Sequence, residues 1–79
     1  MSPEKTFRIG YVSASVFRNT VKKDGVTRAF RNVSLQRRYK DGDEWKHSTS
    51  FGLADLPNAL ECLRLALSYV AEQEAEISS

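Results

Sequence analysis

The sequence predicts an α+β fold in which a twisted antiparallel β-sheet, a meander of three or four strands, is followed by one C-terminal α-helix. Three observations support this class. Extended segments fill residues 7–51, two Asp-Gly pairs divide them, and apolar residues then recur at helical spacing. Seventy-nine residues make one domain. We expect a single ββββα domain over residues 7–72, with an N-terminal tail at residues 1–6 and a frayed C-terminal tail at residues 73–79.

The first predicted extended segment covers residues 7–19. From Tyr11 onward, its residues alternate between two faces, as in a strand. Gly10 interrupts the segment, and a glycine inside a strand often marks a bulge or a bend. Residues 7–9 are therefore predicted as a short separate strand, which gives the sheet its fourth member. Residues 20–25, which end in Asp-Gly, are predicted as a turn.

The second extended segment covers residues 26–39, and the third covers residues 45–51. A charged turn at residues 40–44, with Asp-Gly inside it, joins them. Alternation gives the sheet two unlike faces. One face is apolar and should lie under the helix: Val12, Ala14, Val16, Val33, Leu35 and Phe51. The other is polar in its middle and aromatic or basic towards its edges: Tyr11, Ser13, Ser15, Phe17, Phe30, Asn32, Ser34, Gln36, Arg38, Lys46, Ser48 and Ser50.

The C-terminal segment has the period and composition of a helix. Asp55 is a candidate N-cap, and Pro57 lies in the first turn, where a missing N–H costs nothing. One apolar stripe has a helical period: Leu56, Leu60, Leu63, Leu67 and Val70. A second stripe lies beside it: Ala59, Cys62, Leu65, Ala66 and Tyr69.

Two apolar stripes exceed what one sheet requires. We predict that the first stripe covers the chain's own sheet and that the second, from Ala59 to Tyr69, forms a homodimer interface. A domain of this size has a small core and often gains stability from association. The alternative is a helix that lies deep between the sheet and its turns.

The residue types offer no catalytic machinery. Cys62 is predicted at an apolar mid-helix position, where a thiol usually acts as a small hydrophobic residue, and His47 is the only imidazole. One cysteine and one histidine make neither an internal disulfide nor the usual zinc site. The acids at residues 41–44 fit a solvated turn better than a calcium loop. We expect no enzyme activity, metal, cofactor or small-molecule substrate.

The sequence also bears on the location of the protein. No apolar run approaches the roughly 20 residues that span a bilayer, and the N-terminus lacks the apolar stretch of a signal peptide. A lone thiol fits a reducing compartment. We therefore expect an intracellular, cytoplasmic protein without a membrane partner.

Charge is distributed unevenly along the chain, although the formal net charge is only +2. Eleven basic and five acidic residues precede His47, whereas one basic and five acidic residues follow it. Such a division favours an anionic partner for the basic part. The alternative is that lysines and arginines only solvate an exposed sheet face.

The polar face of the predicted sheet suits single-stranded nucleic acid. Basic side chains follow the phosphates, aromatic rings stack on bases, and small residues let the strand approach. On this basis four residues are candidates for nucleic-acid binding: Tyr11, Phe17, Arg28 and Phe30. An ordinary exposed face of an antiparallel sheet is also polar, and this is the alternative.

The order of features resembles a known family. Phe-Arg-Ile-Gly at residues 7–10 precedes Val-Ser-Ala-Ser-Val-Phe-Arg at residues 12–18. A strand ending in Arg-Arg-Tyr at residues 37–39, an Asp/Gly turn, Trp-Lys at residues 45–46 and a helix opened by an acid follow. Over residues 7–70 this succession resembles the transcriptional-coactivator family called positive cofactor four. Small bacterial and phage proteins share its design, and the Whirly proteins are a larger relative.

The resemblance implies a dimer formed through the helix and a sheet that binds single-stranded DNA without marked sequence preference, in transcription, replication or recombination. By position it implies contacts from Arg18, Arg37, Arg38, Tyr39, Lys40, Trp45 and Lys46. RNA as the ligand stays open. A second hypothesis also stays open, in which the chain is a small protein-interaction or regulatory module that uses the apolar flank of the helix.

Overall fold

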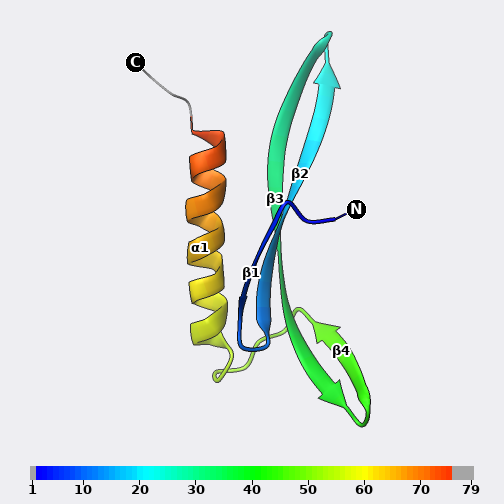
Figure 1. The fold of residues 1–79 in the computed structure, drawn as a ribbon, viewed down its shortest axis with the longest axis vertical. Coiled ribbons are helices and arrows are strands. Elements are labelled where there is room, and N and C mark those ends of the chain that lie inside the picture. Colours follow the sequence, from blue (N-terminus) through cyan, green and yellow to red (C-terminus); the bar gives the residue numbers. More distant parts are fainter. Residues whose placement is uncertain (1, 76–79) are drawn as a thin grey trace.

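The computed structural model describes residues 2–75, and its sheet and helix confirm the predicted fold class (Figure 1). Four antiparallel strands pair in the order β1-β2-β3-β4, and one helix packs on one face of the sheet. The elements are β1 (Lys5–Ile9), β2 (Val12–Lys23), β3 (Val26–Asp41), β4 (Glu44–Ser48) and α1 (Leu56–Glu74). Across residues 2–75, α1 included, the structure shows no helical stretch with the length and apolarity needed to cross a bilayer.

The hairpin of β2 and β3 is longer than predicted. Residues 20–23 continue β2 and do not belong to a turn, so that prediction is wrong. Only Asp24 and Gly25 form the turn, with φ of 54° and 77°, as a two-residue hairpin with both central residues at positive φ requires. The end of this hairpin extends past β1 and α1 (Figure 1). We call residues 20–30, all of which are exposed, the arm.

Gly10 ends β1, as predicted, and lets the chain turn into β2. Its φ is +59°, a left-handed conformation that a side chain disfavours. A Cβ at this position would lie 2.9 Å from Nδ2 of Asn58 on α1. Gly10 therefore serves both the turn and the close approach of the helix.

The core lies between β2 and α1 and consists of small side chains. The buried residues are Val12, Ala14, Val16, Ala59, Cys62 and Ala66. Small residues on both elements let the helix approach the sheet closely. The thiol of Cys62 lies 3.6 Å from the carbonyl oxygen of Val12, and burial raises the pKa of this thiol.

The structure places the second helix stripe, and not the first, against the chain's own sheet, so that prediction is wrong. Ala59, Cys62 and Ala66, predicted for a dimer interface, are 4%, 0% and 1% exposed in the chain's own core. Leu65 is half-buried, and the Tyr69 ring packs edge-on against Phe7 at 6.1 Å between centroids. The leucine stripe is instead exposed: Leu56, Leu60, Leu63 and Leu67. The physical reason is that the helix lies over a strand of small residues, where small side chains fit and leucines do not.

An ion-pair cluster ties both ends of the chain to β3. The Arg31 side chain donates to Glu4 from Nε at 2.7 Å and Nη2 at 3.0 Å, and its backbone N–H donates to Glu74 Oε1 at 2.7 Å. The Arg31 guanidinium holds the pKa of Glu4 below its ordinary value. Strand β1 and helix α1 each extend two residues beyond the predicted domain limits of 7 and 72. Residues 76–79 of the predicted tail lie outside the described residues.

Candidate nucleic-acid interface

The strand register decides which side chains share a face, because paired residues in an antiparallel ladder project to the same side. Ala14 pairs with Leu35 under the helix, whereas Ser15 pairs with Ser34 on the other side. The predicted division of β2 and β3 into two faces agrees with this register. We call the side away from α1 the open face. Its strand residues are Thr6, Arg8, Ser13, Ser15, Phe17, Asn19, Val21, Lys23, Val26, Arg28, Phe30, Asn32, Ser34, Gln36, Arg38, Lys40, Trp45 and His47.

Three predicted residues form one cluster at the β4 end of the open face. The Arg38 guanidinium carbon lies 4.7 Å from the centroid of the Trp45 ring and 5.8 Å from that of Tyr11. The two ring centroids are 5.7 Å apart. Tyr11 and Trp45 are 58% and 48% exposed, so both rings offer surface to a ligand. We call Tyr11, Arg38 and Trp45 the aromatic platform.

Backbone contacts fix the platform. Tyr11 lies in the turn after β1, and its carbonyl oxygen accepts a hydrogen bond from the Arg38 backbone N–H at 2.7 Å. Lys40, on the same face as Arg38, pairs with Trp45 across the β3–β4 ladder. A hollow of about 420 Å³ borders the platform. Its lining residues are Tyr11, Arg37, Arg38, Tyr39, Lys40, Trp45 and Asp55.

Four predicted contacts do not lie on the open face. Arg18 pairs with Arg31, and Tyr39 pairs with Lys46, on the side of the sheet that faces α1. The Lys46 ammonium is also 2.9 Å from Asp41 Oδ2. The prediction that Lys46 shares a sheet face with Arg38 is therefore wrong.

Lys46 and Ser48 were assigned to the wrong face because β4 ends earlier than predicted. The predicted alternation ran unbroken from Trp45 to Phe51, but β4 ends at Ser48. Phe51 does pack against the core, as predicted. Counting faces backwards from it fails because residues 49–51 are not strand.

Arg37, the fourth of these residues, holds the segment between β4 and α1. Its Nε donates to the Ser50 carbonyl oxygen at 2.9 Å and lies 3.5 Å from Asp55 Oδ2. The guanidinium carbon also lies 5.3 Å from the Tyr39 ring centroid. Asp55 precedes the helix as predicted, but its carboxylate accepts from the Gly52 N–H at 3.2 Å and makes no side-chain cap. The role of Arg37 in this structure is therefore to position the start of α1.

Phe17, Arg28 and Phe30 lie on the open face but away from the platform. Phe17 is half-buried at the base of the arm, and Phe30 is 40% exposed on it. A hollow of about 610 Å³ lies along this part of the ribbon, and we call it the arm hollow. Its lining residues are Val21, Lys23, Asp24, Val26, Arg28, Ala29 and Phe30.

The sequence predictions missed three ionisable members of the open face. His47 pairs with Arg38, Arg8 pairs with Ser13, and Lys23 pairs with Val26 next to the turn. The signal for His47 was present, because it has the parity of Trp45. Lys23 was missed because it was assigned to a turn. Among residues 2–75, no group of three His, Cys, Asp or Glu side chains is arranged to hold a metal ion.

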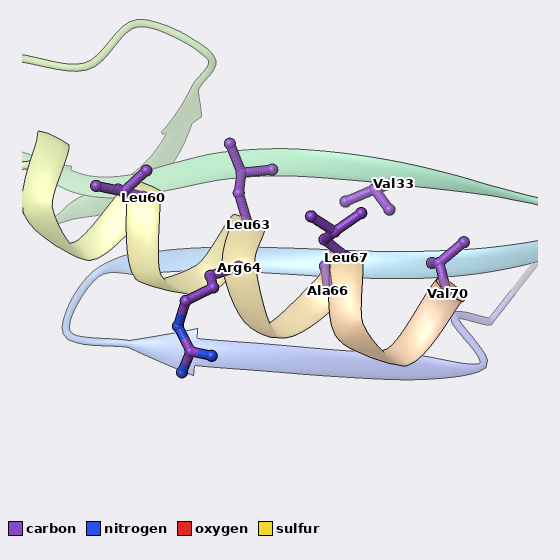
Figure 2. A pocket seen from close by; sticks show the side chains of 7 residues that line it. All are labelled: Val33, Leu60, Leu63, Arg64, Ala66, Leu67 and Val70. Carbon is purple, nitrogen blue, oxygen red and sulfur yellow. The ribbon is translucent and has the colours of Figure 1, made fainter. Parts of the chain in front are cut away.

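A second surface lies along the exposed leucine stripe. In Figure 2, Leu60, Leu63, Leu67 and Val70 line the side of α1 next to Val33 of β3. The hollow between them measures about 480 Å³, and one of about 560 Å³ adjoins it at Leu60 and Leu63. We call this surface the leucine face. Its members are Val33, Leu35, Leu56, Leu60, Leu63, Leu67 and Val70.

Comparison of the chain with protein-family models, with curated proteins and with solved structures finds no match. The resemblance to the positive cofactor four family therefore stays a prediction from the sequence.

Proposed function

We propose that this protein binds single-stranded nucleic acid on the open face of its sheet. The observation that carries the proposal is the aromatic platform, where two exposed rings and a guanidinium lie within stacking distance of one another. Bases of any sequence stack on such rings, and arginine adds a cation–π contribution. The same chemistry gives little sequence preference, because every base has a π-face.

The charges of the open face support an anionic ligand. Among the described strand residues it carries five basic side chains and no aspartate or glutamate. The basic residues are Arg8, Lys23, Arg28, Arg38 and Lys40. Serines at the centre of the face have small side chains, so the backbone of a nucleic-acid strand can approach the sheet between these charges.

Fluorescence anisotropy with labelled oligo-dT at low and moderate salt tests the proposal. We expect binding at micromolar protein that weakens steeply with salt, because phosphate contacts release counterions. Lys40→Ala should weaken binding more than Lys46→Ala, which removes the same charge from the other face. Equal effects of the two substitutions, or salt-insensitive binding, would contradict the proposal. Competition with RNA and duplex DNA then defines the preferred nucleic acid.

We also propose that the leucine face binds a second copy of the chain. Leu60 and Leu67 are 72% and 68% exposed, which places them in water in a single chain. The stripe extends about equally to both sides of Leu63, with Leu60 and Leu67 three and four residues away and Leu56 and Val70 each seven residues away. An isologous dimer needs such a self-complementary surface, since two antiparallel helices then present alike residues to each other.

Light scattering on a size-exclusion column tests the dimer. Leu60→Glu should give a folded monomer, because this side chain contributes little to the chain's own core. Ser68→Glu adds the same charge on the exposed polar side of α1 and should leave the dimer intact. A wild-type monomer with the leucine face uncovered would favour the second hypothesis, a module that binds another protein.

A further inference from the structure

The arm is the part of the sheet that the packing of the domain requires least. Strand β1 pairs with β2 only from Val12 to Val16, and β4 pairs with β3 only from Arg37 to Asp41. Residues 20–30 therefore form a two-stranded ribbon that is exposed on both sides. A ribbon of this kind buries little apolar surface and contributes little to the stability of the domain.

The arm nevertheless exposes apolar side chains beside cations. Phe30, Val21 and Val26 are 40%, 48% and 54% exposed. All three border the arm hollow together with Lys23 and Arg28, and all five belong to the open face. An exposed ring flanked by basic residues repeats the chemistry of the aromatic platform at the opposite end of the same surface.

We infer that the arm hollow is a second binding station for the strand that the platform holds. This inference rests on the proposed function and adds a minimum length for the ligand. The preferred ligands are single strands long enough to reach from the platform to the arm. The lining carries two basic residues, Lys23 and Arg28, against one acid, Asp24. This net positive charge favours a nucleic-acid strand over an apolar protein segment as the occupant.

The spacing of the two stations sets that length. Strand β3 is continuous from Arg38 to Phe30, a separation of eight residues, or about 26 Å at about 3.3 Å per residue. A strand stacked as in a duplex advances about 3.4 Å per nucleotide, so about eight nucleotides cover this distance. Small polar residues, Ser13, Ser15 and Ser34, line the path between the stations. At this rise four nucleotides cover only about 14 Å, which does not reach from one station to the other.

Anisotropy titrations with dT4 and dT16 test the inference on the full chain. Phe30→Ala should weaken dT16 binding by about 5-fold to 150-fold, the range expected for loss of one base–aromatic stack, and should weaken dT4 binding much less, because dT4 can occupy the platform alone. Trp45→Ala should weaken both. Arg28→Ala should weaken dT16 more than Lys22→Ala, a matched loss of charge on the opposite face of the arm, where Lys22 pairs with Thr27.

The outcomes separate the two proposals. If wild type binds neither oligonucleotide, the proposed function fails and the inference fails with it. If wild type binds dT16 but Phe30→Ala and Arg28→Ala have no effect, or reduce dT4 and dT16 binding equally, only the second station is overturned. Because Phe30 and Arg28 are exposed on the arm, circular dichroism should show both variants folded. Altered dimerisation of Phe30→Ala in light scattering would assign the arm to protein contact and overturn the inference.

Discussion

Removal of the Trp45 ring should weaken the binding of single-stranded nucleic acid to the platform. The ring is 48% exposed and lies outside the buried cluster, so truncation to alanine should leave the fold intact. One base–aromatic stack contributes about 1–3 kcal/mol to binding of a single strand. Trp45→Ala should therefore raise the Kd for oligo-dT by about 5-fold to 150-fold.

Arg38 should contribute to binding together with the Trp45 ring. Its guanidinium carbon lies 4.7 Å from the Trp45 ring centroid, and an exposed cation–π contact contributes about 0.5–1 kcal/mol. Arg38→Ala and Trp45→Ala should then be non-additive in a double-mutant cycle. Trp45→Phe keeps a ring and should retain most of the affinity.

Anisotropy at constant low salt gives the Kd values, and thermal denaturation of each variant gives the control for folding. Wild-type affinity in Trp45→Ala, with the melting curve unchanged, would refute the platform as the binding element. Additive losses in the double variant would show that Arg38 and Trp45 act separately.

Two further predictions concern the fold. Gly10→Ala should destabilise the domain by about 1–2 kcal/mol, because φ is +59° and a Cβ would press on Asn58; urea denaturation measures this, and unchanged stability would mean that the turn relaxes freely. Glu4→Gln should lower stability at neutral pH, because the Arg31 guanidinium depresses the pKa of Glu4 in the folded chain. A carboxyl group whose pKa is depressed by folding stabilises the folded chain at pH values above its unfolded pKa, and this contribution is lost as the pH falls through the folded pKa. The difference in melting temperature between wild type and Glu4→Gln should therefore disappear in acid. A difference that stays constant with pH would assign the effect to packing.

The central part of the sheet was predictable because burial on one side imprints alternation on the sequence. Val12, Ala14 and Val16 alternate with serines, and all three are buried. Gly10 was also informative, since a left-handed turn limits the residue types that fit. Residues 20–23 of the arm were wrongly assigned to a turn because the arm is exposed on both sides, and a ribbon without a buried face has no apolar period to read.

The helix shows a second limit of sequence reasoning. Its two stripes have the same period, and hydrophobicity alone favours burial of leucine over alanine. The structure buries Ala59 and Ala66 because β2 also presents small residues and the helix lies close to it. Which stripe faces the sheet depends on this mutual fit, which no single segment encodes. In the same way, the face of Lys46 depends on where β4 ends.

The central claim is that the open face binds the nucleic-acid strand. The most direct measurement is an NMR titration of ¹⁵N-labelled protein with oligo-dT. We expect the largest shifts at the Trp45 indole and at the amides of Ser13, Gln36 and Arg38, with little change along the leucine face of α1. Shifts that cluster on α1, with the Trp45 indole unmoved, would contradict the account.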